Sequence, residues 1–130
     1  MKLAILATTW VSLSTNSIAL EPQFPDWITG LWAYSEEACN DEEHTQSIRI
    51  TDVEIAYYEG SDHLITVVDH RGLGPNGEAG RLLQTRLSYS WADGQEPERD
   101  VFFLLRNGEL YVTEDSGSWL KSRPYSSCDN

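Results

Sequence analysis

Basic residues are scarce in this chain. Its 130 residues include nine Lys and Arg against 21 Asp and Glu, which gives a formal net charge of −12 at pH 7. Proteins bind DNA and RNA largely by placing cationic side chains against phosphates, so this balance argues against a nucleic-acid partner. Anionic membrane surfaces are disfavoured for the same reason. A basic partner protein remains open, as does a charge that serves only solubility.

Long apolar runs are also lacking. The most apolar stretch, Leu3–Leu13, has eleven residues, well short of the roughly 20 that a membrane-spanning helix needs. Lys2 precedes it, and Ser17-Ile18-Ala19 supplies small residues at a cleavage site. These features predict a signal peptide over residues 1–19, ahead of a single β domain over residues 20–130. An uncleaved anchor is the alternative. We expect a periplasmic or secreted protein with no membrane insertion after cleavage and, once Lys2 is lost, a net charge of −13.

Cysteine is limited to Cys39 and Cys128. Export would place both in a compartment where disulfides persist, so we expect them to be paired. The bond would join the start of the domain to its last residues. In the chain-entropy model, a loop of that length stabilises the fold by roughly 4–5 kcal/mol. Two free thiols are the alternative.

No stretch has a convincing helical period, whereas alternation of apolar and polar residues is frequent. Turn signals and β-branched or aromatic residues separate about eight strands. The expected strands are Trp27–Ser35, Ser47–Ile50, Val53–Tyr58, His63–Val68, Arg81–Trp91, the two arms of Val101–Thr113, and Trp119–Ser122. Polar loops join them, including Glu36–Gln46, His70–Gly80 and Ala92–Arg99. The sequence therefore predicts an all-β fold, a small antiparallel β-barrel or sandwich with one disulfide.

Asn107-Gly108, between two apolar strands, predicts a two-residue hairpin turn. The turn sets the register, placing Arg106 opposite Glu109. The face expected in the core carries Val101, Phe103, Leu105, Leu110 and Val112. The opposite face carries Phe102, Leu104 and Tyr111, an apolar contact site if it is exposed. The alternative is cover by a second sheet or by the lead-in segment with Phe24 and Trp27.

Metal-binding and catalytic motifs are missing. His63 and His70 are seven residues apart, an odd number, so a regular strand would place them on opposite faces. His44 completes no known ligand spacing. There is no G-x-S-x-G motif, and neither cysteine is expected to act as a thiolate. We therefore predict no metal, no cofactor and no enzymatic activity.

One set of residues supports a resemblance. Gly30-Leu31-Trp32, followed by Ser35, Cys39, the run Ile48–Glu59 and the near-terminal Cys128, resembles a group of small uncharacterised exported bacterial β proteins. More weakly, the Gly-x-Trp-x-x-Ser opening is similar to that of periplasmic β-barrel inhibitors of zinc proteases. Size, charge and disulfide are similar to those of small barrel inhibitors of lysozyme.

The lysozyme-inhibitor resemblance implies a Ser/Gly-rich contact loop, for which Ser116 and Ser118 are the candidates. We therefore expect a small exported binding module without enzymatic activity, an inhibitor or binder of a basic secreted protein such as lysozyme. The acidic loop Glu36–His44, with Asp41, Glu42 and Glu43, and the segment Glu114–Trp119 would supply contacts. The alternative is a carrier of a small apolar ligand inside the barrel.

Overall fold

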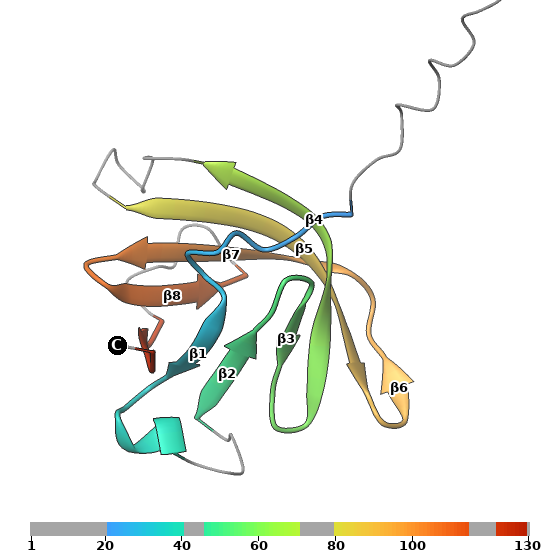
Figure 1. The fold of residues 1–130 in the computed structure, drawn as a ribbon. Helices are drawn as coiled ribbons and strands as arrows, with labels where there is room; N and C mark the ends of the chain where they lie inside the picture. The colour runs from blue at the N-terminus through green and yellow to red at the C-terminus, as the bar shows by residue number, and fades with distance from the viewer. Residues whose placement is uncertain (1–20, 41–45, 71–79, 115–121, 130) are drawn as a thin grey trace, which may run out of the picture.

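The computed structural model describes residues 21–40, 46–70, 80–114 and 122–129. These residues form nine strands and one short 3-10 helix, η2 (Figure 1). The elements are β1 (Gly30–Ala33), η2 (Glu37–Asn40), β2 (Ser47–Ile50), β3 (Glu54–Ala56), β4 (Gly60–His70), β5 (Arg81–Trp91), β6 (Gly94–Gln95), β7 (Arg99–Arg106), β8 (Glu109–Thr113) and β9 (Tyr125–Ser127). The signal peptide predicted over residues 1–19 lies outside the described residues.

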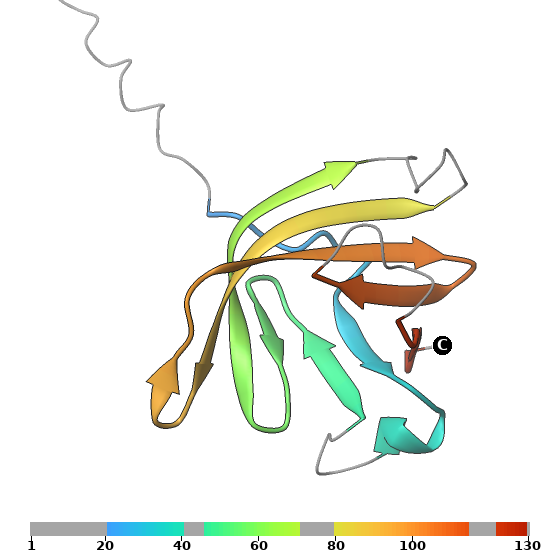
Figure 2. The ribbon, with the colours of Figure 1, turned by 180° about the vertical axis from the view of Figure 1, so that it is seen from behind.

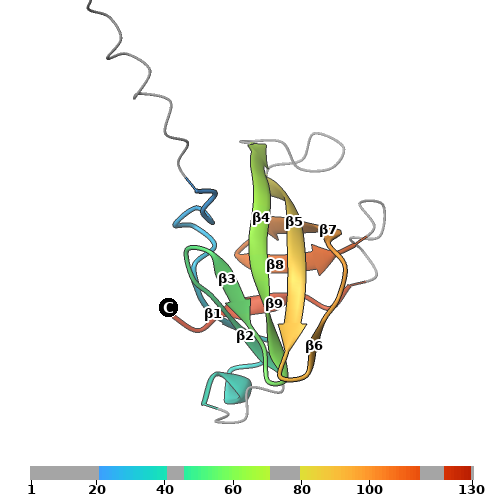
Figure 3. The same cartoon turned by 90° about the vertical axis from the view of Figure 1, so that its right-hand side faces the viewer.

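The strands form one antiparallel sheet that closes on itself. The order is β4-β3-β2-β1-β9-β8-β7-β5, and pairing of β4 with β5 closes an eight-stranded barrel. A ninth strand, β6, pairs with the last two residues of β5. Figure 3 shows β4 and β5 running the length of the barrel, with β7, β8 and β9 crossing behind them. The all-β prediction is confirmed, and of the two expected architectures the protein adopts the barrel.

The alternating pattern of β5 and the turn of the next hairpin gave correct predictions. β5 spans Arg81–Trp91, as expected. Asn107 and Gly108 both have positive φ, 54° and 79°, which is the backbone geometry of a type I′ turn. The predicted register follows, with Arg106 opposite Glu109 and Phe103 opposite Val112. Because a one-residue slip would turn every side chain to the other face, this turn decides which residues enter the core.

The barrel interior is filled with apolar side chains. The five residues predicted for the core face of the hairpin are buried or pack against the buried cluster. Phe103, Leu83, Leu87 and Leu110 have no exposed surface. Burial of each such side chain stabilises the fold by about 1.5–3 kcal/mol. The chain therefore has one continuous core along the barrel axis.

The lead-in segment ahead of β1 also enters this core. Phe24 is 3% exposed and Ile28 is fully buried. The Phe24 ring meets Phe103 edge to face, with 6.0 Å between the ring centroids. Of the alternatives given for cover of the outer face of the hairpin, cover by Phe24 is therefore excluded, because Phe103 belongs to the inner face. Of the three outer residues, Leu104 is only 1% exposed, whereas Phe102 and Tyr111 are partly exposed.

Several strand limits differ from the prediction. The first strand begins at Gly30, because Ile28 N–H donates to the Pro25 carbonyl and forms a turn. Gly30 has a φ of 128°, a conformation that other residues rarely adopt. Val53–Tyr58 is shortened to Glu54–Ala56, and His63–Val68 is extended to Gly60–His70. The predicted turn Ala92–Arg99 contains the short strand β6.

The predicted final strand, Trp119–Ser122, is not found where the structure describes it. Residues 119–121 lie outside the described part, Ser122 is not in a strand, and the described C-terminal strand is Tyr125–Ser127. This strand lies between β1 and β8. Figure 2 shows the C-terminal segment beside β1, on the side of the barrel that carries η2.

The predicted disulfide is confirmed. Cys39, in η2, is bonded to Cys128, which directly follows β9, and their Cα atoms are 5.7 Å apart. The bond closes a loop with a sequence separation of 89 residues. The Cys128 N–H also donates to the Leu31 carbonyl at 2.8 Å. The disulfide therefore ties η2, at one end of the barrel, to the C-terminal strand.

Candidate functional site

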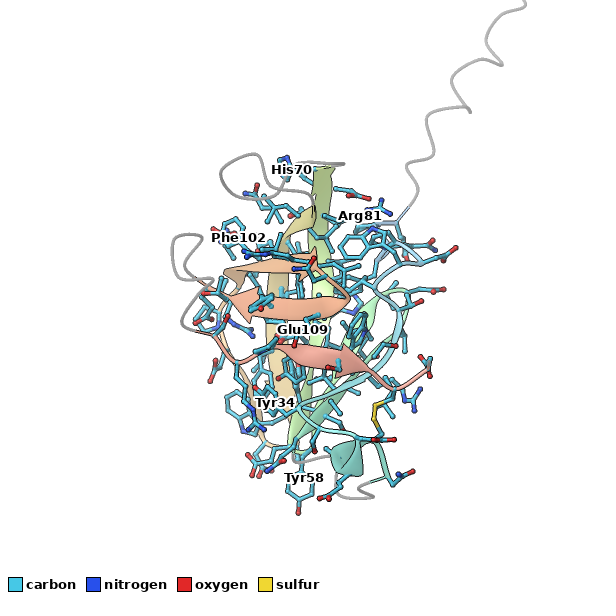
Figure 4. All side chains as sticks on the ribbon, turned by 90° about the vertical axis from the view of Figure 1, so that its left-hand side faces the viewer. Tyr34, Tyr58, His70, Arg81, Phe102 and Glu109 are labelled. Atoms are coloured by element: carbon cyan, nitrogen blue, oxygen red, sulfur yellow. A yellow bond between two sulfur atoms is a disulfide. The ribbon has the colours of Figure 1, made fainter. Side chains whose placement is uncertain are left out.

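Three connections meet at one end of the barrel, which we call the tyrosine end. They are η2, the β3–β4 turn (Tyr57–Glu59) and the β5–β6 turn (Ala92–Asp93), all at the bottom of Figure 1. Tyr34 and Tyr58 lie at this end, and His70 lies at the opposite end (Figure 4). The largest exposed apolar surfaces here belong to Tyr58, at 57% exposure, and Trp91, at 39%.

An open hollow of about 460 Å³ occupies this end, and we call it the tyrosine hollow. Strand periodicity explains its lining. Tyr57 follows the buried Ile55 by two residues, and Tyr89 follows the buried Leu87 by two, so each ring lies on the inner face. The lining residues are Tyr34, Gln46, Ser47, Ile48, Tyr57, Tyr58, Glu59, Tyr89 and Tyr125. Five tyrosines from distant parts of the sequence are thus brought together by closure of the barrel.

One side of the tyrosine hollow is a three-layer stack. The Tyr34 and Tyr125 rings are 4.2 Å apart and nearly parallel, at 14°. The guanidinium carbon of Arg123 lies 4.4 Å from the centre of the Tyr34 ring. Burial and a hydrogen bond with Tyr34 raise the pKa of Tyr125 above its ordinary value. Arg123 therefore covers the Tyr34 ring, which serves mainly as part of the wall of the tyrosine hollow.

Beside the tyrosine hollow is a buried ion pair. Asp62 has no exposed surface, and its two carboxylate oxygens accept hydrogen bonds from Arg99 Nη1 at 2.6 Å and Nη2 at 2.8 Å. The Tyr57 hydroxyl donates to Asp62 Oδ2 at 2.6 Å. Arg99 Nε also lies 2.7 Å from Glu114 Oε1. Paired and bidentate contacts of this kind are what makes burial of a charge tolerable.

The ion pair changes the protonation behaviour of its partners. Burial, together with the adjacent Asp62 carboxylate, raises the pKa of Tyr57 well above its ordinary value. The hydrogen bonds to Asp62 raise the pKa of Arg99 above its ordinary value. Tyr57 therefore stays neutral and Arg99 stays charged across the physiological pH range. This arrangement holds the Tyr57 hydroxyl and the Asp62 carboxylate in fixed positions beside the tyrosine hollow.

A second hollow, of about 410 Å³, lies next to the first. Glu59 and Tyr89 line both hollows, and Trp91, Ala92 and Glu96 complete the second, which we call the acid–aromatic hollow. The Tyr89 and Trp91 rings are 5.8 Å apart. The tyrosine end also carries Glu36 and Glu37 on or beside η2, and Asp93 in the β5–β6 turn. Aromatic rings and carboxylates therefore alternate across one end of the molecule.

The candidate contact residues from the sequence are only partly placed by the structure. Asp41, Glu42, Glu43, Ser116 and Ser118 lie outside the described residues. Phe102 lies on the hairpin, well away from Tyr58 and the tyrosine end (Figure 4). Leu104 is buried and offers no surface to a partner. The tyrosines and the Asp62–Arg99 pair were not predicted as a site, because their convergence depends on barrel closure.

The predicted orientation of the histidines is wrong. A bulge in β4 between Leu64 and Thr66 adds one unpaired residue, which reverses the alternation beyond it. His63 and His70 therefore lie on the same, outer face of the barrel, and His70 lies 3.3 Å from Gln84.

Within the described ranges, no group of three or more His, Cys, Asp or Glu side chains is arranged to hold a metal ion. None of the helices in those ranges is long and apolar enough to cross a membrane.

Comparison with protein-family models, with curated proteins and with solved structures found no match for this chain. The resemblance to small exported inhibitors of secreted enzymes therefore remains a hypothesis.

Proposed function

We propose that this protein is a small exported binding module without enzymatic activity that associates with a strongly basic protein through its tyrosine end. Inhibition of a basic secreted enzyme, such as a lysozyme, is the most specific form of the proposal. The observation that carries it is the gathering at this end of exposed Tyr58 and Trp91 with five carboxylates. These carboxylates belong to Glu36, Glu37, Glu59, Asp93 and Glu96.

Charge supports a basic partner. A surplus of carboxylates creates a negative field that attracts cationic surfaces and raises the association rate. Several arginines in the described part of the chain are already engaged with carboxylates of the protein itself. Arg86 contacts Glu98 and Asp100, and Arg81 contacts Asp69. At the tyrosine end, Arg99 is paired with Asp62 and Glu114 and Arg123 lies on Tyr34, whereas five carboxylates are exposed, so the local field is negative.

Exposed aromatic side chains would supply the short-range contacts. Tyr and Trp are enriched at protein interfaces because each presents a large rigid surface at low entropic cost. The filled core supports this proposal over the alternative, a carrier of a small apolar ligand. The barrel axis is occupied by Phe103, Leu83, Leu87 and Leu110, and both hollows at the tyrosine end open to the surface.

The test is binding to lysozyme and other basic secreted enzymes, measured by biolayer interferometry at several salt concentrations. We expect an on-rate that falls steeply between about 0.05 and 0.5 M salt, because the Debye length shortens over this range. A variant with Glu59→Gln, Asp93→Asn and Glu96→Gln should associate more slowly. No binding to any basic protein at low salt would refute the proposal.

A matched control separates local charge from total charge. Glu21→Gln, Asp26→Asn and Asp52→Asn remove the same number of charges, from the lead-in segment and from the β2–β3 turn that accepts a hydrogen bond from Phe24 N–H. This control variant should keep most of the on-rate. If both variants slow association equally, net charge acts without a defined surface, and the assignment to the tyrosine end is wrong.

A further inference from the structure

The acid–aromatic hollow combines groups that together favour a cation. It presents the rings of Tyr89 and Trp91 and the carboxylates of Glu59 and Glu96, with Ala92 between them. None of its described lining residues is basic. Aromatic faces attract cations through the ring quadrupole, most strongly for Trp, and a nearby carboxylate adds direct attraction.

Backbone contacts hold this lining in place. The Glu96 N–H donates to the Tyr89 carbonyl at 2.9 Å, so the backbone of Glu96 is held beside that of Tyr89. Gly60 lies against Tyr89, and a Cβ there would come within 2.7 Å of the Tyr89 hydroxyl. Gly94 lies against Trp91, where a Cβ would approach the indole to 2.5 Å at Cζ2. The two glycines therefore allow the turns to pack closely against the rings.

Another contact in this protein combines an aromatic ring, a carboxylate and a cation. The guanidinium carbon of Arg81 lies 4.8 Å from the centre of the Trp27 ring, and its Nη2 lies 3.2 Å from Asp69 Oδ2. The indole of Trp27, the carboxylate of Asp69 and the guanidinium of Arg81 thus form one three-part contact. Trp91 with Glu59 and Glu96 supplies the indole and carboxylate portions of that combination, and no described residue of its lining supplies the guanidinium.

We infer that the acid–aromatic hollow binds the guanidinium of an arginine side chain projecting from the basic partner, an inference that rests on the proposed function. Guanidinium is planar and weakly hydrated, so it stacks on Tyr and Trp while its N–H groups donate to carboxylates. A lysine ammonium is more strongly hydrated and lacks the planar face. The neighbouring tyrosine hollow is less suitable, because Arg123 already covers Tyr34 and adds a like charge.

The probe is N-acetyl-arginine-N-methylamide, titrated into the full protein while the indole N–H of Trp91 is followed by NMR. Trp91→Phe assigns that signal. We expect a saturable shift with an affinity in the millimolar range, as suits one side chain without its protein. The corresponding lysine amide should bind more weakly, and the citrulline amide, which has the same shape but no charge, should cause no saturable shift.

Two single-charge variants localise the effect. Glu96→Gln should weaken binding of the arginine amide about two- to fivefold. Asp52→Asn removes one charge from the β2–β3 turn, outside the hollow, and its affinity should match that of the unmodified protein. Preserved dispersion of the amide spectrum would show that both variants are folded. Equal weakening in both variants, or equal binding of the arginine and citrulline amides, would overturn the inference.

The experiments can refute the proposed function and the guanidinium site independently of each other. Binding of lysozyme or another basic enzyme without any response to the arginine amide leaves the proposed function in place and removes the guanidinium site. A saturable response to the arginine amide without binding of any basic protein supports the cation site and removes the proposed function. A lysine amide that binds as tightly as the arginine amide overturns the assignment to guanidinium.

Discussion

The Asp62–Arg99 ion pair allows the clearest test of how the tyrosine end is held together. Arg99→Met preserves a long apolar stem but removes both hydrogen bonds to Asp62 and the contact with Glu114. The Asp62 carboxylate would stay fully buried, with the Tyr57 hydroxyl as its remaining side-chain donor. A buried charge that loses its partner typically destabilises a fold by about 3–5 kcal/mol, and we expect a loss in that range.

Removing the charge of Asp62 should destabilise the fold less than removing the charge of Arg99. In Asp62→Asn, Arg99 keeps its contact with Glu114, and its side chain is 30% exposed, so water can replace part of what is lost. The amide oxygen can still accept one hydrogen bond. The expected loss is about 1–3 kcal/mol. Arg99→Met should therefore be the more destabilising of the two, although each variant breaks the same ion pair.

Urea denaturation measures both losses. With a slope of about 2 kcal/mol per molar, Arg99→Met should lower the midpoint by about 2 M. A loss below about 1 kcal/mol for Arg99→Met, or a larger loss for Asp62→Asn, would refute this account of the pair.

Three further predictions concern the core, the charge and the tyrosines. Phe103→Ala should destabilise the fold by about 3–5 kcal/mol in urea denaturation, and Phe102→Ala clearly less, because only Phe103 is fully buried; equal losses would contradict this. Neutralising Asp41–Glu43 should slow association with a basic enzyme while leaving the melting temperature nearly unchanged, and an unaltered on-rate would exclude this loop. Because burial raises the pKa of Tyr57 and Tyr125, the folded protein should lose stability as the pH rises past the ordinary tyrosine value of about 10. Spectrophotometric titration should then show some tyrosines ionising only on unfolding, and complete ionisation in the folded state near pH 10 would contradict it.

Local patterns in the sequence were sufficient to predict part of the barrel. β5 alternates over its whole length, and Asn107-Gly108 allows only a narrow choice of turn, so both could be placed without knowledge of the fold. The β4 bulge could not be predicted, since one extra residue near Ile65 leaves no distinct sequence signal. It reversed the predicted orientation of His63 relative to His70. The short strand β9 depends on its neighbours β1 and β8 rather than on its own three residues.

The candidate site was harder to predict than the strands. Asp62 falls between the expected strands Val53–Tyr58 and His63–Val68, yet it pairs with Ile55 on one side and Tyr89 on the other, which places it on the inner face. Strand alternation places Tyr89 on the same face as the buried Leu87. It gave no indication that Tyr57 and Tyr125 would lie beside the same hollow, because the pairings that unite them cross from one end of the sequence to the other.

The distribution of arginines connects the fold to the proposed function. Arg99 neutralises a carboxylate inside the barrel, Arg81 lies between Trp27 and Asp69, and Arg123 lies on Tyr34. Each of these cations serves a contact within the protein. The carboxylates of Glu59 and Glu96, by contrast, line the acid–aromatic hollow, where no described lining residue is basic. We therefore propose that the cation completing this hollow comes from another molecule, which is why the proposed partner is basic.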